Sequence, residues 1–528
     1  RVVRTEMPTQ KNKNKKSPGR PRKAEEPQVD LHGLEKDDLL DIYRNMFLSR
    51  EIDEEEIRLK GKGKIFFQIN GCGHEAINTV LGRVLDPQRD WFFPYYRDRA
   101  LMLQLGLTPT EMLKMGTGSH DEPAGAGRQM PSHWGAKHLH VVNQSSCTGS
   151  QCLHAVGTAE AWKKGKDDAS LREQIEDWSD GEIAHVSVGD GTTSEGEFWE
   201  SLSTACNLEL PVLFVVEDNG YAISVPVEVN TPGGSISKLV LGFPGLDVRE
   251  VDGCDPIACH AMLTKVVADM RRGNGPTLVH AKVVRPYSHS LSDDERLYRP
   301  ASEREEDEPR DPLTSFPKFL LEHGFADEEA LEKIRQEVRA EVREASDIAV
   351  ESPQADPSTV LDHLYSPTVD PTSDRFESPA VVEEGAAPTT MVDMINASLR
   401  DEMRRDPRIH VFGEDVADAS RSEALEEVKG KGGVFKATFG LQREFGGDRV
   451  YNSPLAEANI VGRAIGMAVR GLKPVVGYRD QIKCQSHLST FGGAILQIVY
   501  FYQTFYVLVS FFVVVDKEYI WLKLVGRL

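Results

Sequence analysis

The sequence predicts an α/β fold with a parallel sheet flanked by helices, and residues 189–224 carry most of that prediction. An apolar strand, HVSVG, leads into the triplet GDG at positions 189–191. The next segment is helical, because Phe198, Leu202 and Ala205 repeat at the spacing of one buried helix face. The apolar run PVLFVV has strand length and ends at the polar sequence EDNG. Together the three segments form a strand–helix–strand unit.

Both polar clusters of this unit stand at the carboxyl ends of strands, where open parallel sheets bind their ligands. Asp190 follows the first strand and Asn219 follows the second, so the two side chains are expected to converge. Their oxygen atoms suit Mg²⁺, which prefers oxygen ligands and commonly keeps a partner phosphate. The alternative is an ordinary turn, in which glycine and aspartate are also common.

The GDG triplet followed about thirty residues later by Asn-Gly-Tyr resembles the thiamine-diphosphate signature. The flanking sequence is similar to the alpha subunits of branched-chain 2-oxo acid dehydrogenases, the decarboxylating first component of those complexes. The resemblance implies the thiamine-diphosphate-binding fold, with Mg²⁺ held by Asp190, Asn219 and the backbone carbonyl of Tyr221. It also implies that Gly189 and Gly191 lie beside the cofactor.

The composition is that of a globular, acidic protein. Its 528 residues allow two or three domains with a sizeable core. The formal net charge of −21 argues against general nucleic-acid binding by the body of the chain. Seven cysteines form neither a disulfide framework nor metal-type pairs, which favours a reducing compartment. We therefore expect a protein of the bacterial cytoplasm or of an organelle matrix.

Residues 1–30 are expected to form a disordered basic tail, because so polar a segment cannot bury a core. Its sequence GRPRK is similar to the minor-groove core of an AT-hook. DNA binding through this tail is therefore an alternative function, but a solvated disordered tail is the favoured explanation of the composition.

Residues 31–345 are expected to form the alpha-type, thiamine-diphosphate-binding domain, which opens with an amphipathic helix over 34–60. The segment DWFFPYYRDR contains Tyr96 and Arg97. An arginine fork matches phosphate oxygens, and the resemblance implies that both residues contact the cofactor diphosphate. The alternative is a packed aromatic turn with a surface arginine.

Two loops extend this assignment. The sequence GRQMPSH, which begins at Gly127, is typical of the branched-chain members and is expected to cover the substrate entrance. Further along, the resemblance places Thr148 beside the cofactor. It also places Ser145, Ser150 and Gln151 around a structural K⁺, although serines in a loop need no ion to explain them.

Residues 280–285 are predicted to form a strand, and the loop after it carries His289 beside Asp293 and Asp294. A histidine at such a position can transfer a proton or contact a phosphate. The sequence HSLSDD resembles the phosphate-binding and regulatory loop of the branched-chain members. That resemblance implies that His289 meets both the diphosphate and the incoming lipoyl group; the alternative is a surface histidine.

A linker rich in Pro, Ser, Thr and Asp is expected over 346–388. Residues 389–476 resemble part of the pyrimidine-binding domain of the beta subunit, so the chain looks like an alpha–beta fusion with two related domains. Within SPLAEANIVGRAIG, Glu457 begins an apolar helix. The resemblance implies that it hydrogen-bonds the aminopyrimidine ring, whereas a carboxylate interacting with the helix dipole is the alternative.

The resemblance ends near Gly477, and residues 477–528 are expected to be a divergent apolar tail. Residues 484–515 contain no Asp, Glu, Lys or Arg. We expect a truncated or divergent beta part. A membrane span, which the length permits, is disfavoured, and buried or aggregation-prone strands remain open.

The expected function is oxidative decarboxylation of a branched-chain 2-oxo acid, such as 3-methyl-2-oxobutanoate, with acyl transfer to the lipoyl group of a dihydrolipoyl acyltransferase. His289 and Glu457 are the expected catalytic residues, and a homodimer without nucleic acid or membrane is the expected assembly. A pyruvate-specific enzyme and an inactive fragment are the alternatives, the latter because the second catalytic histidine of the beta part finds no match. Whether one chain or a dimer forms the site stays open.

Overall fold

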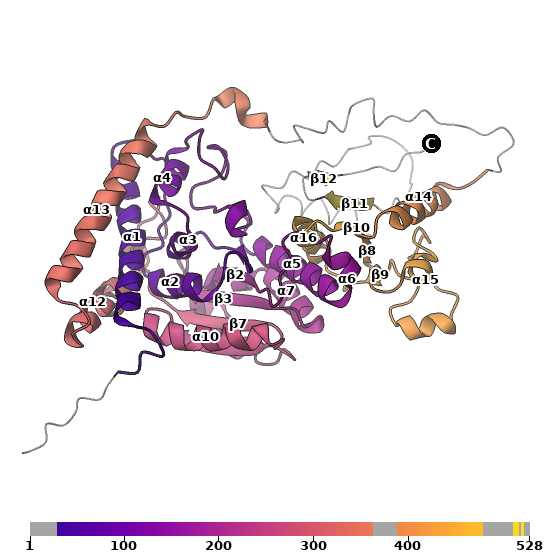
Figure 1. Ribbon diagram of the computed structural model, residues 1–528, viewed down its shortest axis with the longest axis horizontal. Helices are drawn as coiled ribbons and strands as arrows, with labels where there is room; N and C mark the ends of the chain where they lie inside the picture. The colour runs from indigo at the N-terminus through magenta and orange to yellow at the C-terminus, as the bar shows by residue number, and fades with distance from the viewer. Residues whose placement is uncertain (1–28, 363–387, 479–510, 517–518, 522–528) are drawn as a thin grey trace, which may run out of the picture.

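The computed structural model describes residues 29–362, 388–478, 511–516 and 519–521 (Figure 1). The expected basic tail up to residue 28, the expected linker from 363 to 387 and the apolar stretch 479–510 lie outside the described residues. Among the described residues, no helix combines the length and the apolarity needed to cross a lipid bilayer.

The first domain is built on a five-stranded sheet in which every neighbouring pair of strands is parallel. The strand order is β1 (Trp91–Phe93), β2 (Ala184–Gly189), β3 (Val212–Asp218), β7 (Thr277–Lys282) and β6 (Asp247–Asp252). The prediction of an α/β fold with a parallel sheet flanked by helices is confirmed.

The central strand β3 is buried on both faces, as strands of parallel sheets are when helices cover both sides. Leu213 and Val215 belong to one core cluster, whereas Phe214 and Val216 belong to another. This alternation follows from the two-residue period of a strand. The helices of this domain follow the numbering of Figure 1. They are α1 (Lys36–Gly61), α2 (Glu75–Val84), α3 (Arg99–Leu105), α4 (Pro109–Thr117), α5 (Ser150–Asp167), α6 (Ala169–Arg172), α7 (Gly196–Asn207), α8 (Val227–Asn230), α9 (Ile236–Val240), α10 (Pro256–Arg271), α11 (Ala301–Asp307), α12 (Pro312–Glu322) and α13 (Glu328–Glu351).

Helix α1 confirms the amphipathic helix expected near residues 34–60, and its residues Leu39, Ile42 and Met46 are fully buried. The long helix α13 lies beside it (Figure 1). Because Ala349 is buried and its carbonyl accepts a hydrogen bond from Thr117, α13 stays helical to Glu351. The first residues of the expected linker are therefore helical.

The predicted strand over 280–285 is wrong at both ends, since β7 begins at Thr277 and ends at Lys282. Its partner β3 ends at Asp218, which lies opposite Lys282 in the register. The other partner, β6, also ends opposite Lys282, at Asp252. The chain therefore leaves the sheet there, and Arg285 donates a hydrogen bond to the carbonyl of Ile223.

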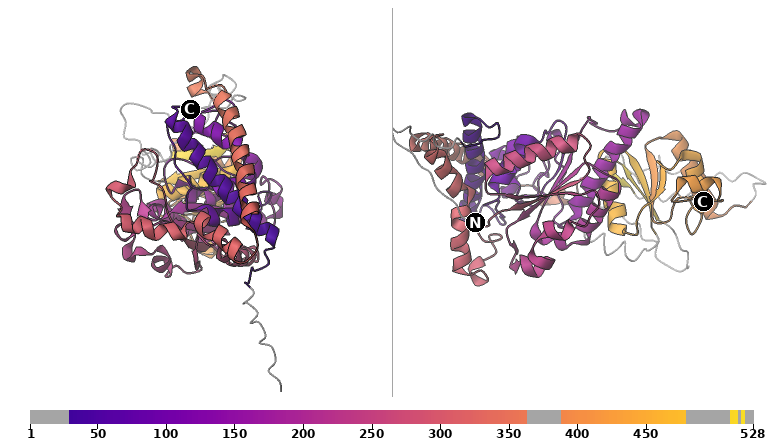
Figure 2. Two further views of the ribbon diagram at one scale, coloured as in Figure 1. Left: turned by 90° about the vertical axis from the view of Figure 1, so that its left-hand side faces the viewer. Right: turned by 90° about the horizontal axis from the view of Figure 1, so that it is seen from below.

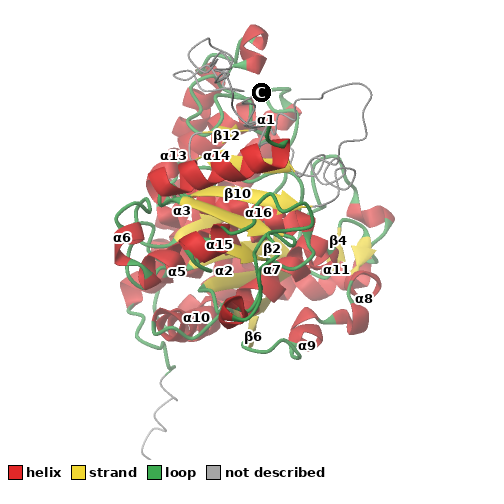
Figure 3. Ribbon diagram, turned by 90° about the vertical axis from the view of Figure 1, so that its right-hand side faces the viewer, coloured by secondary structure: helices red, strands yellow, loops and turns green. Residues whose placement is uncertain are grey.

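The second domain contains a smaller sheet with helices on both faces (Figure 3). Its strand order is β12 (Tyr519–Trp521), β11 (Phe511–Asp516), β10 (Lys473–Tyr478), β8 (Ile409–Gly413) and β9 (Val450–Asn452). Strands β8, β9 and β10 are parallel, whereas β11 and β12 join in antiparallel pairing. Two strands of the expected apolar tail thus extend this sheet.

The helices of the second domain are α14 (Met391–Arg405), α15 (Leu441–Phe445) and α16 (Glu457–Val469). Helix α14 packs over the face that contains Val411 and Val475, and α16 packs over the face that contains Phe412 and Val476. The helix–strand order predicted from residue 389 onward is confirmed by α14 and β8.

The two domains lie side by side (Figure 2). They meet through α5 and α16, whose backbones approach each other closely. A Cβ at Gly157 would lie 2.0 Å from the carbonyl oxygen of Arg463, and one at Gly466 would lie 2.0 Å from that of His154. Thr158 donates a 3.1 Å hydrogen bond to the carbonyl of Gly466. The close contact therefore requires glycine on both helices.

Replacing Gly466 with alanine is expected to destabilise the protein by about 1–3 kcal/mol, because the methyl group meets backbone atoms that have no room to move. Urea unfolding followed by tryptophan fluorescence measures the loss. The matched control is Gly61→Ala at the end of α1, where a Cβ meets nothing within 4 Å and a change below about 0.5 kcal/mol is expected. Equal stabilities for Gly466→Ala and the wild type would contradict this account of the contact.

Candidate functional site

The site begins where β2 ends at Gly189 and a short 3₁₀ turn, Asp190–Ser194, leads toward α7. A Cβ at Gly189 would lie 2.7 Å from the hydroxyl of Tyr95. A Cβ at Gly191 would lie 2.6 Å from the Cβ of Ala222. The two glycines thus let neighbouring segments close around the aspartate between them.

Asp190 is buried, with only 3% of its surface exposed, and its Oδ2 atom has no hydrogen-bond partner among the described residues. Burial and, to a smaller extent, the nearby carboxylate of Asp218 raise the pKa of this carboxyl to about 7. A buried charge without a partner is costly unless an opposite charge or a metal compensates it. This oxygen, Oδ2 of Asp190, can therefore serve as a ligand to a cation.

Asn219 lies next to Asp190, since its backbone hydrogen-bonds to the aspartate carboxylate. The two strand ends therefore lie side by side, with the Asn219 backbone at the Asp190 carboxylate. The Asn219 Oδ1 atom accepts a 3.2 Å hydrogen bond from the backbone N–H of Tyr221. Tyr221 itself begins the two-residue strand β4 (Tyr221–Ala222), which pairs with β5 (Val225–Pro226), and its hydroxyl donates to Glu303 at 2.7 Å.

Asn219 also faces a residue that the motifs did not indicate. Its Nδ2 lies 3.2 Å from Nε2 of the fully buried His74. The His74 Nδ1 atom lies 2.5 Å from Oε2 of Glu217, which is also fully buried. The one available signal in the sequence was Glu217, an acidic residue inside the apolar strand VLFVVED.

Arg97, Tyr96 and His289 form a second cluster. Arg97 is 1% exposed, and its Nη2 donates to Nδ1 of His289 at 3.1 Å. The guanidinium lies 5.1 Å from the centre of the Tyr96 ring, whose edge meets His289. Arg97 Nε has no hydrogen-bond partner among the described residues. The surface-arginine alternative is therefore wrong, because this side chain is buried.

His289 is neutral in this environment. Burial lowers its pKa to about 3, and the positive charges of Arg97 and Arg285 act in the same direction. Because Arg97 donates to Nδ1, the single ring proton belongs on Nε2. The imidazole is thus a donor at Nε2.

The loop before α5 and the first turn of that helix carry the remaining alpha-domain candidates. Ser145 Oγ accepts from the N–H of Cys147, Gln151 Oε1 accepts from the N–H of Gly149, and Ser150 Oγ donates to the carbonyl of Cys147. Thr148 is exposed on this loop. A Cβ at its neighbour Gly149 would lie 3.3 Å from Glu195 and 3.5 Å from Thr192, so the loop borders the turn that follows Asp190.

Glu457 is half-buried at the first turn of α16, as predicted, and its charge helps to raise the pKa of Glu200 on α7. Two residues further, the N–H of Asn459 donates to Oε2 of Glu200 at 2.9 Å. Glu457 therefore lies beside α7, the helix that follows the turn carrying Asp190.

No group of three or more His, Cys, Asp or Glu side chains within the described ranges is placed to hold a metal ion. A cation at Asp190 would have to complete its shell with amide, backbone and phosphate oxygens, as Mg²⁺ does in phosphate sites.

Two family models match the chain. The dehydrogenase E1 component matches residues 43–358, and the transketolase pyrimidine binding domain matches residues 387–478. The chain is 35% identical over 334 residues to the 2-oxoisovalerate dehydrogenase subunit alpha of Bacillus subtilis, which spans 63% of this chain and 97% of the relative. It is 30% identical over 327 residues to the mitochondrial 2-oxoisovalerate dehydrogenase subunit alpha 2 of Arabidopsis thaliana, an alignment that covers 61% of this chain and 66% of the relative. It is 29% identical over 340 residues to the human mitochondrial 2-oxoisovalerate dehydrogenase subunit alpha, and this alignment covers 64% of this chain and 73% of the relative.

Asp190→Asn is expected to stabilise the cation-free protein by about 1–3 kcal/mol at pH 8, because it removes a buried charge that lacks a partner. At that pH the wild-type carboxyl, with a pKa of about 7, is mostly ionised. Urea unfolding in the presence of a chelator measures the difference, with the exposed Asp347→Asn as the control. If Asp190→Asn proved less stable than the wild type, Asp190 would not be an uncompensated buried charge.

Proposed function

Because the chain belongs to the family of the dehydrogenase E1 component, we propose that it decarboxylates a branched-chain 2-oxo acid with thiamine diphosphate as cofactor. The relatives named as 2-oxoisovalerate and 3-methyl-2-oxobutanoate dehydrogenases support 3-methyl-2-oxobutanoate as the substrate type. The acyl product would pass to the lipoyl group of a dihydrolipoyl acyltransferase. The observation that carries the proposal is the convergence of Asp190 and Asn219 at the carboxyl edge of the sheet, within the matched residues.

Bound thiamine diphosphate supplies the electron sink that allows CO₂ to leave a 2-oxo acid. Asp190, Asn219 and the carbonyl of Tyr221 would hold Mg²⁺, which in turn holds the diphosphate. Gly189 and Gly191 would allow the close backbone approach that the site needs. The orphaned Oδ2 of Asp190 supports this assignment, because a divalent cation would compensate its charge.

Tyr96, Arg97 and His289 would face the diphosphate and the substrate side of the site. Arg97 carries the positive charge and keeps an unpartnered Nε. His289 would hold its proton on Nε2, where it can donate to a negatively charged group of the substrate or of the lipoyl carrier. Its neutral state avoids repulsion from Arg97, which lies 3.1 Å away.

Glu457 would hydrogen-bond the aminopyrimidine ring and promote its activation. The match of residues 387–478 to a pyrimidine-binding domain and the place of Glu457 at the start of α16 support this role. We further propose that the chain is an alpha–beta fusion, in which α5 and α16 join the two parts, and that it works as a homodimer. Either one chain or two would then bring Glu457 to the cofactor.

The loop before α5 would complete the site. Thr148 would lie beside the cofactor, which the proximity of Gly149 to Thr192 supports. Ser145, Ser150 and Gln151 would hold a structural K⁺, because their side-chain oxygens lie where this loop enters the first turn of α5.

Calorimetric titration of the full chain with thiamine diphosphate is expected to show binding only when Mg²⁺ is present. Asp190→Ala should weaken that binding roughly 100-fold or more, since losing one partner of a buried charge pair costs about 3 kcal/mol or more. The exposed Asp347→Ala is the control and should bind as the wild type does. Undiminished affinity in Asp190→Ala would remove Asp190 from the site.

Decarboxylation assayed with an artificial electron acceptor is expected to give a higher kcat/KM for 3-methyl-2-oxobutanoate than for pyruvate. The loop sequence GRQMPSH and the names of the relatives motivate this order. A clear preference for pyruvate would defeat the branched-chain assignment and leave the reaction class standing.

A further inference from the structure

A chain of fully buried polar side chains lies behind Asn219. His74, Asn78, Asp98 and Glu217 each have an exposed fraction of 0%. The Oε2 atom of Glu217 accepts hydrogen bonds from Nδ1 of His74 at 2.5 Å and from Nδ2 of Asn78 at 3.2 Å. Burying so many polar groups is costly, and they are placed directly against a proposed cation ligand.

Glu217 is the acceptor at the far end of this chain. Asp98 hydrogen-bonds to it, and burial together with the charge of Glu217 raises the pKa of Asp98 well above its usual value. Asp98 therefore keeps a proton and donates it. Ser187 and the N–H of Tyr95 donate to the other side of Asp98. Glu217 therefore accepts hydrogen bonds from Asp98, His74 and Asn78.

The carboxylate of Glu217 determines which ring nitrogen of His74 carries the proton. An acceptor at 2.5 Å from Nδ1 requires a hydrogen on Nδ1. In a neutral imidazole whose single proton is on Nδ1, the Nε2 atom keeps its lone pair. Nε2 therefore presents a lone pair toward Asn219.

Within the Asn219 amide, only the NH₂ group can donate a hydrogen bond to this lone pair. Its Nδ2 atom lies 3.2 Å from Nε2 of His74. A flipped amide would place Oδ1 against the Nε2 lone pair and the NH₂ group against the N–H of Tyr221. In the observed orientation, Oδ1 of Asn219 accepts the N–H of Tyr221. After a flip, Oδ1 would no longer be available as a ligand for a cation.

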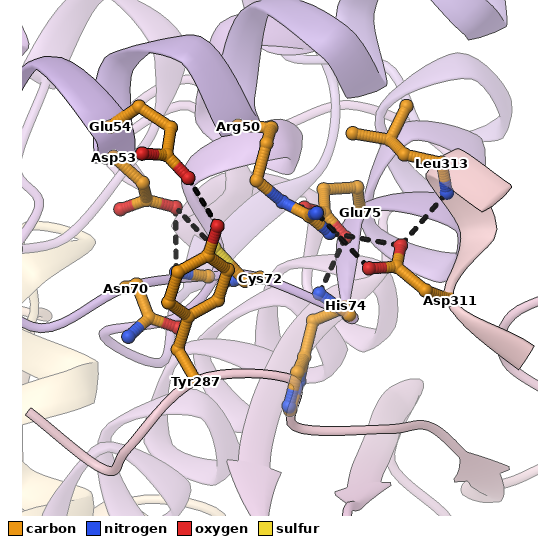
Figure 4. Close-up of polar contacts among 12 residues, drawn as sticks. Arg50, Asp53, Glu54, Asn70, Cys72, His74, Glu75, Tyr287, Asp311 and Leu313 are labelled. Carbon is orange, nitrogen blue, oxygen red and sulfur yellow. Dashed lines mark hydrogen bonds and ion pairs between the residues drawn. The ribbon is translucent and has the colours of Figure 1, made fainter. Parts of the chain in front are cut away.

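The loop that carries His74 is itself anchored (Figure 4). The N–H of Gly71 donates to Asp53 at 3.0 Å, and Arg50 binds both Glu75 and Asp311. Figure 4 shows the His74 ring on the side of the loop away from Arg50 and Asp311.

Gly73 closes the loop tightly, since its φ is +87° and a Cβ there would lie 2.1 Å from the carbonyl oxygen of Val284. A side chain at this position would therefore be strained both by its backbone conformation and by a backbone neighbour.

We propose that His74 is a positioning residue, held in one tautomer by Glu217, that orients the amide of Asn219 with Oδ1 toward the cation expected at Asp190. This inference rests on the proposed function, because it concerns the same cation. It adds a requirement that Asp190 and Asn219 alone do not contain.

Two variants of His74 separate the two hydrogen bonds. His74→Asn can still donate to Glu217 from the position of Nδ1, but it offers nothing to Asn219. His74→Gln reaches the position of Nε2 and can accept from Asn219 through its amide oxygen, while it loses the bond to Glu217. The exposed His138→Asn is the matched control.

The measurement is the Kd of the full chain for Mg²⁺ at saturating thiamine diphosphate, by calorimetry, together with the unfolding midpoint of each ligand-free variant. His74→Asn is expected to raise the Kd about tenfold or more, the usual effect of losing a group that orients a metal ligand. His74→Gln is expected to stay within about threefold of the wild type. Excess Mg²⁺ should restore the kcat of His74→Asn, which a purely structural role would not allow.

Equal losses in His74→Asn and His74→Gln, or unchanged affinity in both, would overturn the inference while leaving the proposed function intact. A wild-type chain that binds no thiamine diphosphate with Mg²⁺ would overturn the proposed function and this inference together. A Kd that follows the unfolding midpoint across the variants would also overturn the inference, since His74 would then act only through stability.

Discussion

The buried carboxylate of Asp190 is the constraint on which the rest of the site depends. Other acidic groups around it are already compensated. Asp218 pairs with His280 and Lys282, and its pKa is lowered to about 2 even though burial alone would raise it. Glu217 shares the proton of Asp98 and receives His74. Asp218 and Glu217 thus have partners within the protein, whereas Oδ2 of Asp190 has none among the described residues. A cation attracted to this edge of the sheet therefore finds this carboxylate oxygen available.

The contact between α5 and α16 relates the second domain to that position. Glycines bring the two backbones together, and buried ion pairs flank the contact: Arg463 lies 2.7 Å from Glu160, and Arg470 makes two hydrogen bonds to Glu182. Such pairs contribute little net stability, because desolvation offsets their attraction, but a displaced partner would leave a charge buried alone. They therefore specify the docking arrangement more than they strengthen it. The same arrangement sets Glu457 beside α7.

The sequence predicted what depends on local pattern. The parallel sheet followed from apolar runs of strand length, and the meeting of Asp190 with Asn219 followed from the rule that carboxyl ends of parallel strands share an edge. The end of β7 was not predictable in this way, because it depends on where its partner β3 ends. His74 was also missed. It lies 143 residues from Glu217 in the chain, and only the folded sheet shows that this buried acid has a partner.

The position of Asn219 depends on residues far from the sheet edge. Asp311 caps the start of α12 and binds Arg50 of α1, which in turn holds Glu75 at the start of α2. Burial raises the pKa of Glu75 to about 7, and Arg50 opposes that shift, so the pair is stable only while both partners stay in place. The loop before Glu75 has little freedom, since its glycine amides are bonded on one side and its backbone meets Val284 on the other. The cap of α12, Asp311, thus helps to fix the amide of Asn219. Rigid support of this kind can hold a polar ligand atom in place before the cofactor binds.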